Sequence, residues 1–147
     1  MSDKRESRSR IRVVALAIIR DGPRLLVRRY TAPNGDRYYR SLGGAVEFGE
    51  WAEQAVEREI LEEIEAEIEQ VRYVATVENI FERDGRIGHQ IEFLFEAQLV
   101  DRSLYRAELI NGTESSGKRI EAVWLDLSEP LDGPLYPEGL RDLLTIE

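Results

Sequence analysis

The chain has 147 residues, a formal net charge of −9 and no cysteine. This length suits one domain with a substantial core. The acidic balance argues against a nucleic-acid groove or an anionic membrane surface as partner. The lack of cysteine excludes disulfides, a thiolate nucleophile and a cysteine-based zinc site. No apolar run approaches the roughly 20 residues that span a bilayer, and no secretory signal is evident, so we expect a cytoplasmic location.

The chain begins with a polar stretch, MSDKRESRSR, so residues 1–10 predict a disordered tail. Two apolar stretches follow, Ile11–Ile19 and Arg24–Tyr30, and the turn residues Asp21-Gly22-Pro23 lie between them. This pattern predicts a β-hairpin. We find no linker beyond it, and we expect residues 11–147 to form a single domain.

The next feature is an acidic segment that follows two glycines, GGAVEFGEWAEQAVEREILEEIEA. It predicts a helix that begins near Glu50. Glu59, Glu62 and Glu63 are spaced i, i+3 and i+4, so they share an arc of about 100° on the helix. The apolar stripe of the helix continues from the edge of this arc. Glu59 and Glu63 are therefore expected to turn toward the packed side.

Acids in that position require an explanation. A carboxylate near the core is costly unless it is paired or binds a metal, and like charges four residues apart repel. A divalent cation with a preference for oxygen ligands, Mg²⁺ or Mn²⁺, would relieve both costs. The competing interpretation is a solvated acidic face, which is the usual explanation of a glutamate-rich helix.

The same segment resembles the Nudix box, G-x5-E-x7-R-E-U-x-E-E-x-G-U, where U is a bulky apolar residue. The resemblance runs from Gly44 to Ala66 and rests on matches at Gly44, Glu50, Arg58, Glu59, Ile60, Glu62 and Glu63. Glu65 stands where the family has glycine, which leaves the helix free to continue toward Glu69. The proline that often precedes the two glycines is also missing, since Ser41-Leu42 stands there.

Resemblance to the Nudix hydrolases, of the MutT-like kind, implies an α/β fold, namely an α/β/α sandwich around a mixed β-sheet. It also implies an enzyme that hydrolyses a pyrophosphate linkage in a nucleotide with the help of Mg²⁺ or Mn²⁺. By this resemblance the metal ligands are the carbonyl of Gly43 and the carboxylates of Glu59, Glu62 and Glu63. Arg58 would orient the box acids, with Glu50 among its partners.

The family often brings an arginine to the substrate phosphate from a strand just before the box. Arg28 and Arg29 end such a strand, and by the resemblance Arg29 is the better candidate. A guanidinium suits this role because it grips phosphate oxygens with two hydrogen bonds. The alternative is that both arginines are solvated residues at a strand end.

Beyond the box, the pattern predicts three strands, a surface loop over residues 101–118 and a short closing helix at Pro137–Leu144. The strands are expected at Val71–Phe81, His89–Val100 and Ile120–Leu127. Trp124 is expected in the core, and the only histidine, His89, in a structural role. The family often adds a fourth carboxylate from this region, and the general base is open as well. The candidates for the fourth carboxylate are Glu78, Glu82, Glu92 and Glu96.

Two other classes of function remain open. One is a sensor or regulator that binds a nucleotide without hydrolysing it, which the missing proline and Glu65 keep in consideration. The other is an interaction module whose acidic helix is merely solvated. The partner expected from the resemblance is a small nucleotide, with a nucleoside triphosphate as the default substrate. Many relatives form dimers, so a homodimer is left open.

Overall fold

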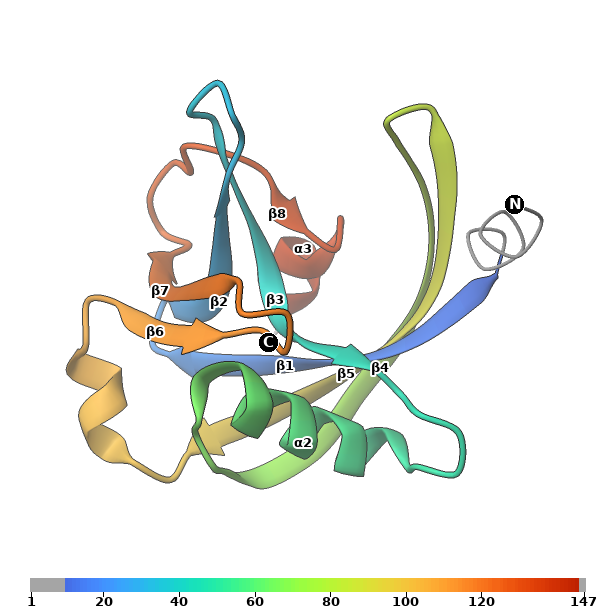
Figure 1. Ribbon diagram of the computed structural model, residues 1–147. Helices are drawn as coiled ribbons and strands as arrows, with labels where there is room; N and C mark the ends of the chain where they lie inside the picture. Colours follow the sequence, from blue (N-terminus) through green and yellow to red (C-terminus); the bar gives the residue numbers. More distant parts are fainter. Residues whose placement is uncertain (1–9, 146–147) are drawn as a thin grey trace.

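The computed structural model describes residues 10–145, so the tail expected at residues 1–10 lies outside the described part except for Arg10. Eight strands form one sheet within this part of the chain (Figure 1). They are β1 (Ile11–Asp21), β2 (Arg24–Thr31), β3 (Arg37–Ala45), β4 (Ile68–Arg83), β5 (Arg86–Leu99), β6 (Ile110–Thr113), β7 (Arg119–Asp126) and β8 (Leu135–Tyr136). The helical elements are α2 (Ala52–Ile64), the 3₁₀ helix η1 (Arg102–Arg106) and α3 (Leu140–Thr145).

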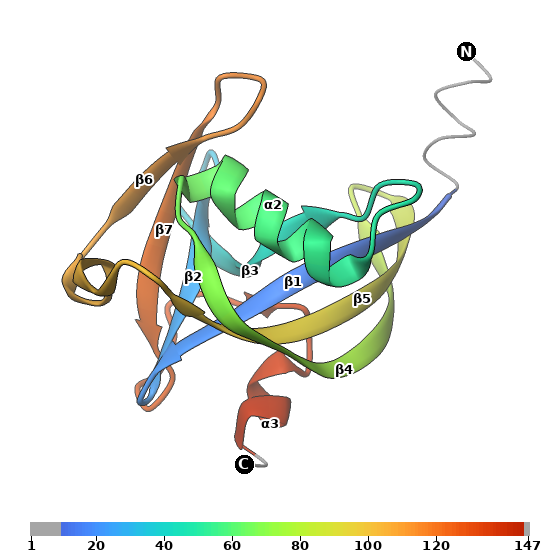
Figure 2. The same cartoon turned by 90° about the horizontal axis from the view of Figure 1, so that it is seen from below.

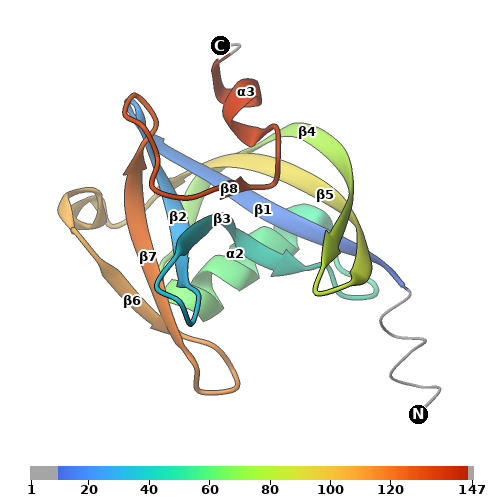
Figure 3. The same cartoon turned by 90° about the horizontal axis from the view of Figure 1, so that it is seen from above.

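The sheet is mixed. Its strand order is β4-β5-β1-β3-β2-β7-β6, and β8 joins at β3. β1 runs parallel to β5 and β8 parallel to β3, while the other pairs are antiparallel. Helix α2 crosses one face (Figure 2), and α3 lies on the opposite face (Figure 3). The expected α/β/α sandwich with a mixed sheet is therefore confirmed.

Strand β1 is apolar on both sides because both of its faces are covered. Successive side chains of a strand point to opposite faces. Ala15, Ala17 and Ile19 accordingly share a buried cluster with the apolar stripe of α2, whereas Val14, Leu16 and Ile18 share another with Leu140 and Leu144 of α3. The central strand thus fixes both helices with one continuous apolar run.

The sheet opens into two parts near its middle. The predicted hairpin of β1 and β2 is paired at its turn, through Arg20 with Leu25 and Asp21 with Arg24. Residues 42–45 of β3 pair with β1, whereas residues 37–41 pair with β2. Figure 1 shows the result: β2 and β3 rise on one side, the β4–β5 hairpin rises on the other, and α2 lies below both.

Helix α2 ends before Glu69, toward which the sequence left it free to continue. Its last residue is Ile64, and Glu65 adopts the left-handed conformation, with φ 53°. The Glu65 N–H donates to the Leu61 carbonyl at 3.0 Å, as in a helix C-terminus that glycine usually closes. The expectation that the helix continues toward Glu69 is therefore wrong. The physical reason is that Ala66 is buried and β4 begins at Ile68, so the chain must turn back to the core.

One further expectation needs correction. Residues 101–118 are not one surface loop, since they contain η1 and β6. Trp124 is half-buried and donates from Nε1 to the Leu104 carbonyl at 3.0 Å, in keeping with a structural role. Across residues 10–145 the helices are too short or too polar to cross a bilayer.

The left-handed Glu65 generates a test of stability. A non-glycine residue in this conformation costs about 1–2 kcal/mol, while glycine adds about 0.5–1 kcal/mol of unfolded-state entropy. Glu65→Gly should therefore raise the free energy of unfolding by about 0.5–1 kcal/mol, as measured by urea denaturation. Glu57→Gly, at an exposed position inside α2, should lower it by about 1 kcal/mol. A loss of stability in both variants would contradict the role assigned to Glu65.

Candidate active site

The two glycines of β3 let three elements meet. Gly43 has φ 140°, and a Cβ there would lie 2.1 Å from the Ala15 carbonyl oxygen of β1. A Cβ on Gly44 would lie 2.4 Å from the carboxyl carbon of Glu59 on α2. Real side chains do not approach so closely, so only glycine allows both contacts. The Gly-Gly pair brings the sheet backbone against the acidic face of α2.

Arg58 is the centre of the charged groups at the start of α2. Its Nε and NH2 donate to the two oxygens of Glu50 at 2.8 and 3.0 Å, which is a bidentate pair. Its NH1 donates to Glu59 at 3.0 Å and to Glu62 at 3.3 Å, and NH2 also donates to the Ala45 carbonyl. The hydrogen bonds from Arg58 lower the pKa of Glu50 to about 2. The structure thus brings together four of the predicted site residues.

Glu63 occupies a different environment. Its Oε1 accepts a hydrogen bond from the Gly43 N–H at 3.0 Å, and its Oε2 lies 3.7 Å from Arg28 NH1. Burial raises the pKa of Glu63 to about 7, and burial also raises the pKa of Glu59. Glu62 is the most exposed of the three helix acids, with 58% of its side chain accessible. Glu59 and Glu63 therefore turn toward the packed side, as the helical spacing predicted.

Arg28 and Arg29 lie on opposite faces of β2. Arg28 is on the side of α2, close to Glu63. Arg29 donates from Nε and NH2 to Glu121 of β7, at 3.1 and 3.0 Å, on the other face. The structure therefore places Arg28 nearest the box acids, and the phosphate contact expected of Arg29 stays a prediction.

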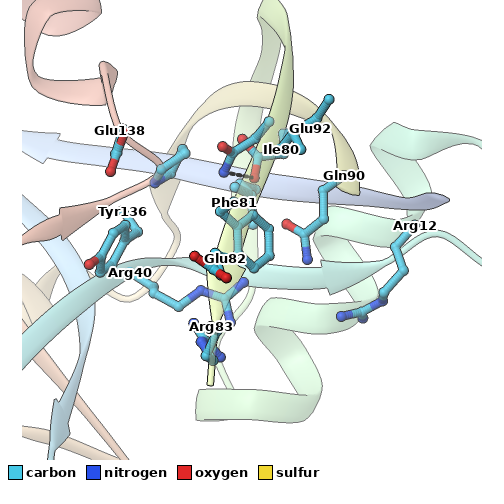
Figure 4. A pocket seen from close by; sticks show the side chains of 13 residues that line it. Arg12, Arg40, Ile80, Phe81, Glu82, Arg83, Gln90, Glu92, Tyr136 and Glu138 are labelled. Atoms are coloured by element: carbon cyan, nitrogen blue, oxygen red, sulfur yellow. Dashed lines mark hydrogen bonds between the residues drawn. The ribbon is translucent and has the colours of Figure 1, made fainter. Parts of the chain in front are cut away.

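A cavity of about 430 Å³ lies between β3, the β4–β5 hairpin and the segment around β8 (Figure 4). Its lining includes Arg40, Phe81, Gln90, Glu92 and Tyr136. Such a volume and such a mixture of aromatic and polar groups are typical of a small-molecule site. Gln90 and Glu92 are less than 10% exposed, so their polar groups are turned inward.

The four candidates for the fourth carboxylate fall into two pairs. Glu78 accepts from His89 at 2.9 Å across the hairpin, and Glu96 pairs with Arg72, so both have structural partners. Glu82 and Glu92 line the cavity. Asn79 donates to Oε2 of Glu92 at 3.4 Å, whereas Oε1 has no hydrogen-bond partner among residues 10–145. Burial raises the pKa of Glu92. A buried oxygen without a partner is costly, so a hydrogen-bond donor or a cation would stabilise it.

Sequence reasoning missed Arg40, Asn79 and Gln90. Burial raises the pKa of both Glu63 and Glu92, and the charge of Arg40 opposes part of that rise at each, so Arg40 connects the box acids with the cavity. No signal marks Gln90, because the alternation of Ile91, Phe93 and Phe95 places it on the opposite face of the strand, where polar residues are expected. No local signal marks Arg40, since its neighbours come from distant segments.

The acids fit a divalent cation in their chemistry, although their arrangement here is set by Arg58. Carboxylate oxygens are the ligands that Mg²⁺ prefers, and the burial of Glu59 and Glu63 favours a neutralising partner. Within residues 10–145, however, no three acidic or histidine side chains are gathered closely enough to enclose a metal. Arg58 holds Glu59 and Glu62, and Gly43 holds Glu63. A cation must compete with these bonds.

Comparison with known proteins identifies a family and several relatives. The family model described as "NUDIX domain" matches residues 9–143. The NAD-capped RNA hydrolase NudC of Haemophilus influenzae (strain PittGG) is 30% identical over 127 residues, which cover 84% of this chain and 42% of NudC. The oxidized purine nucleoside triphosphate hydrolase of Mus musculus is 23% identical over 128 residues, 86% of this chain and 74% of that protein. The chain thus spans less than half the length of the NudC relatives.

Two solved structures share the fold. The crystal structure of a MutT NUDIX hydrolase from Burkholderia pseudomallei has a TM-score of 0.65 and 26% identity, and the match covers 93% of this chain and 98% of that one. The solution structure of the E. coli ORF135 protein has a TM-score of 0.59 and 26% identity, with 93% and 90% covered. Both matches extend over nearly the whole chain rather than over the box alone.

The two glycines of β3 should respond differently to substitution. Gly44→Ala meets the end of a flexible Glu59 side chain, which can move, so the free energy of unfolding should fall by about 1 kcal/mol or less. Gly43→Ala meets backbone at 2.1 Å and has φ 140°, so the loss should reach about 3 kcal/mol or more. Denaturant titration of both variants measures the contrast, and equal losses would contradict it.

Proposed function

Because this chain belongs to the NUDIX domain family, we propose that it is a pyrophosphohydrolase that splits a pyrophosphate linkage in a nucleotide with Mg²⁺ or Mn²⁺. The observation that carries the proposal is the set of box carboxylates on α2 beside Gly43 and Gly44 of β3. Relatives named for hydrolysis of NAD-capped RNA and of oxidized purine nucleoside triphosphates support a nucleotide substrate.

Each residue of the site has a proposed task. Glu59, Glu62 and Glu63, with the carbonyl of Gly43, would hold the cation, which when bound supplies charge stabilisation and an acidified water. Arg58 fixes Glu50 with a bidentate pair and keeps the box acids in place. These contacts prearrange negative charge where a cation and a phosphate must meet, and prearranged charge is what phosphoryl chemistry requires.

The cavity beside the box is proposed to hold the nucleoside part of the substrate. Phe81 and Tyr136 offer aromatic surface to a base, and Gln90 offers an amide that can both donate and accept. Arg40 lies between this cavity and Glu63, where it can neutralise a phosphate. Arg28 and Arg29 are further candidates for phosphate contact. The cytoplasmic location, the single domain over residues 11–147 and a homodimer stay predictions.

A substrate panel tests the proposal and its alternative. Release of pyrophosphate or of a nucleoside monophosphate is measured with nucleoside triphosphates, oxidized purine triphosphates, NADH and NAD-capped RNA, each with and without Mg²⁺. A pyrophosphohydrolase releases product from at least one of them only with metal. Nucleotide binding without product release would identify the sensor, and neither binding nor release would leave an interaction module.

The first prediction concerns the metal. A ligand that binds only the folded protein raises its stability by RT ln(1 + [L]/Kd). At about 100 times the Kd, Mg²⁺ or Mn²⁺ should raise the melting temperature by about 5–10 °C. Differential scanning calorimetry with metal and with EDTA measures the shift. Identical melting temperatures at millimolar metal would remove the basis for a metal site.

The second prediction separates catalysis from stability. Glu63→Gln should reduce metal-dependent hydrolysis at least about 100-fold, since it removes a ligand charge. The pKa of Glu63 is raised to about 7, so its ionised form destabilises the metal-free fold above that pH, and this cost is absent below pH 4.5. Metal-free Glu63→Gln should therefore be as stable as the wild type or more stable at pH 8, and lose this advantage at pH 4.

The matched control is Glu57→Gln, because Glu57 is exposed on the same helix. It removes the same charge from α2 at a position of the box that the Nudix pattern leaves variable, so hydrolysis should stay within about twofold of wild type. Near-normal turnover by Glu63→Gln, or an equal loss in Glu57→Gln, would show that Glu63 is not a metal ligand.

A further inference from the structure

Arg28 is buried between α2 and the turn that joins β6 to β7. Its NH2 donates to Glu114 Oε1 at 2.5 Å, while its NH1 lies 3.7 Å from Glu63 Oε2. Only 8% of Arg28 is exposed, and the guanidinium lies over the Tyr30 ring at 4.6 Å from its centre. Arg28 therefore has one close carboxylate partner outside the box and one more distant partner within it.

Glu114 is held firmly in this position. Its backbone closes the turn, because its N–H donates to the Lys118 carbonyl at 2.7 Å and its carbonyl accepts from Gly117 N–H at 2.8 Å. Ser116 Oγ donates to its second carboxylate oxygen at 3.3 Å. The hydrogen bond from Arg28 lowers the pKa of Glu114, so Glu114 is ionised at neutral pH.

The strand before this turn is pressed against the same helical segment that carries Glu63. A Cβ on Gly112 of β6 would lie 1.7 Å from the Glu63 carbonyl oxygen. The position of the turn is thus tied to the last turn of α2. The backbone around Glu114 therefore keeps its place relative to the backbone of Glu63, and the side chain of Arg28 lies between them.

We propose that Glu114 is a positioning residue for the metal site, because it keeps the Arg28 guanidinium from closing onto the carboxylate of Glu63. This inference rests on the proposed function. A buried guanidinium needs an anionic partner, and a bidentate pair with a carboxylate is its favoured geometry. With Glu114 present, the Arg28 guanidinium has its anionic partner in Glu114. Without it, Glu63 becomes the nearest partner, and Arg28 competes with the cation for the same oxygens.

The sum of the charges also predicts weaker metal binding when Glu114 is replaced. Ionised Glu114, Arg28 and Glu63 carry a combined charge of −1, which leaves one negative charge to attract a cation. Replacement of Glu114 by glutamine leaves Arg28 and Glu63 as a neutral pair. The loss should therefore appear as weaker metal binding, even though Glu114 is not proposed to touch the metal.

The test is a double-mutant cycle on the full chain, in which isothermal titration calorimetry measures Mn²⁺ affinity. Glu114→Gln should weaken the affinity about tenfold, within the usual range for coupled sites. In the background of Arg28→Met, the same change should alter affinity by no more than about twofold, since the residue through which Glu114 acts is gone. Circular dichroism verifies that each variant is folded.

A matched control is Glu121→Gln. Glu121 of β7 accepts a hydrogen bond at 3.0 Å from Arg29, which lies on the face of β2 opposite to Arg28. The substitution removes an equivalent arginine–glutamate pair without changing the surroundings of Glu63, so Mn²⁺ affinity should be unchanged. An equal loss of Mn²⁺ affinity in Glu121→Gln would mean that Glu114→Gln acts only through the net charge of the protein, and it would overturn the inference.

A crystal structure of metal-free Glu114→Gln makes the test independent of the Arg28 variants. Arg28 should form a direct salt bridge with Glu63, shorter than the present 3.7 Å, and an unmoved Arg28 would overturn the inference. Failure of the two proposals is distinguishable. A wild type that binds no Mn²⁺ contradicts the proposed function, whereas a wild type and a Glu114→Gln variant that bind equally contradict only the positioning role.

Discussion

The contact between β3 and α2 at the two glycines is the constraint on which the rest of the site depends. Gly43 lies against the backbone of β1, and Gly44 lies against the carboxylate of Glu59. Because neither position has a side chain, an acidic helix can lie against a central strand of the sheet. The Gly43 N–H can then donate to Glu63, and the box carboxylates meet the sheet at the place where its two parts diverge.

Two arginines balance the negative charge of the acids on α2. Arg58 connects Glu50, Glu59 and Glu62, and Arg28 shares its charge between Glu63 and Glu114. Buried or half-buried acids would otherwise repel one another and destabilise α2. At the proposed metal site, a cation would have to displace these arginine–glutamate interactions. Its affinity would therefore depend on the arginines as well as on the acids.

The cavity and the box acids are contributed by different parts of the chain that meet only in the fold. β3 and β8 form one wall of the cavity, the β4–β5 hairpin forms the other, and Arg40 connects it to Glu63. Glu92 comes from β5 and has an unpartnered buried oxygen. The walls of the cavity can therefore change in sequence without altering the residues of the box.

The sequence by itself determined the box helix, the face on which Glu59 and Glu63 lie, the central strand and the α/β class. Each of these follows from local spacing: the helical period places acids beside an apolar stripe, and a continuous apolar run marks a strand buried on both faces. The pairing of Arg58 with Glu50 was also within reach, because both lie within the box motif.

Only the tertiary structure decided the end of the helix, the separation of Arg28 from Arg29 and the contact of Glu114 with Arg28. Glu65 takes a left-handed conformation that its own preference would not predict, since the burial of Ala66 and the start of β4 require a turn there. Arg28 and Arg29 are adjacent in sequence, yet the alternation of a strand sends them to opposite faces, and which face meets α2 depends on the sheet order. Contacts between residues 86 positions apart, such as Arg28 and Glu114, carry no local signal because they arise from packing and not from periodicity.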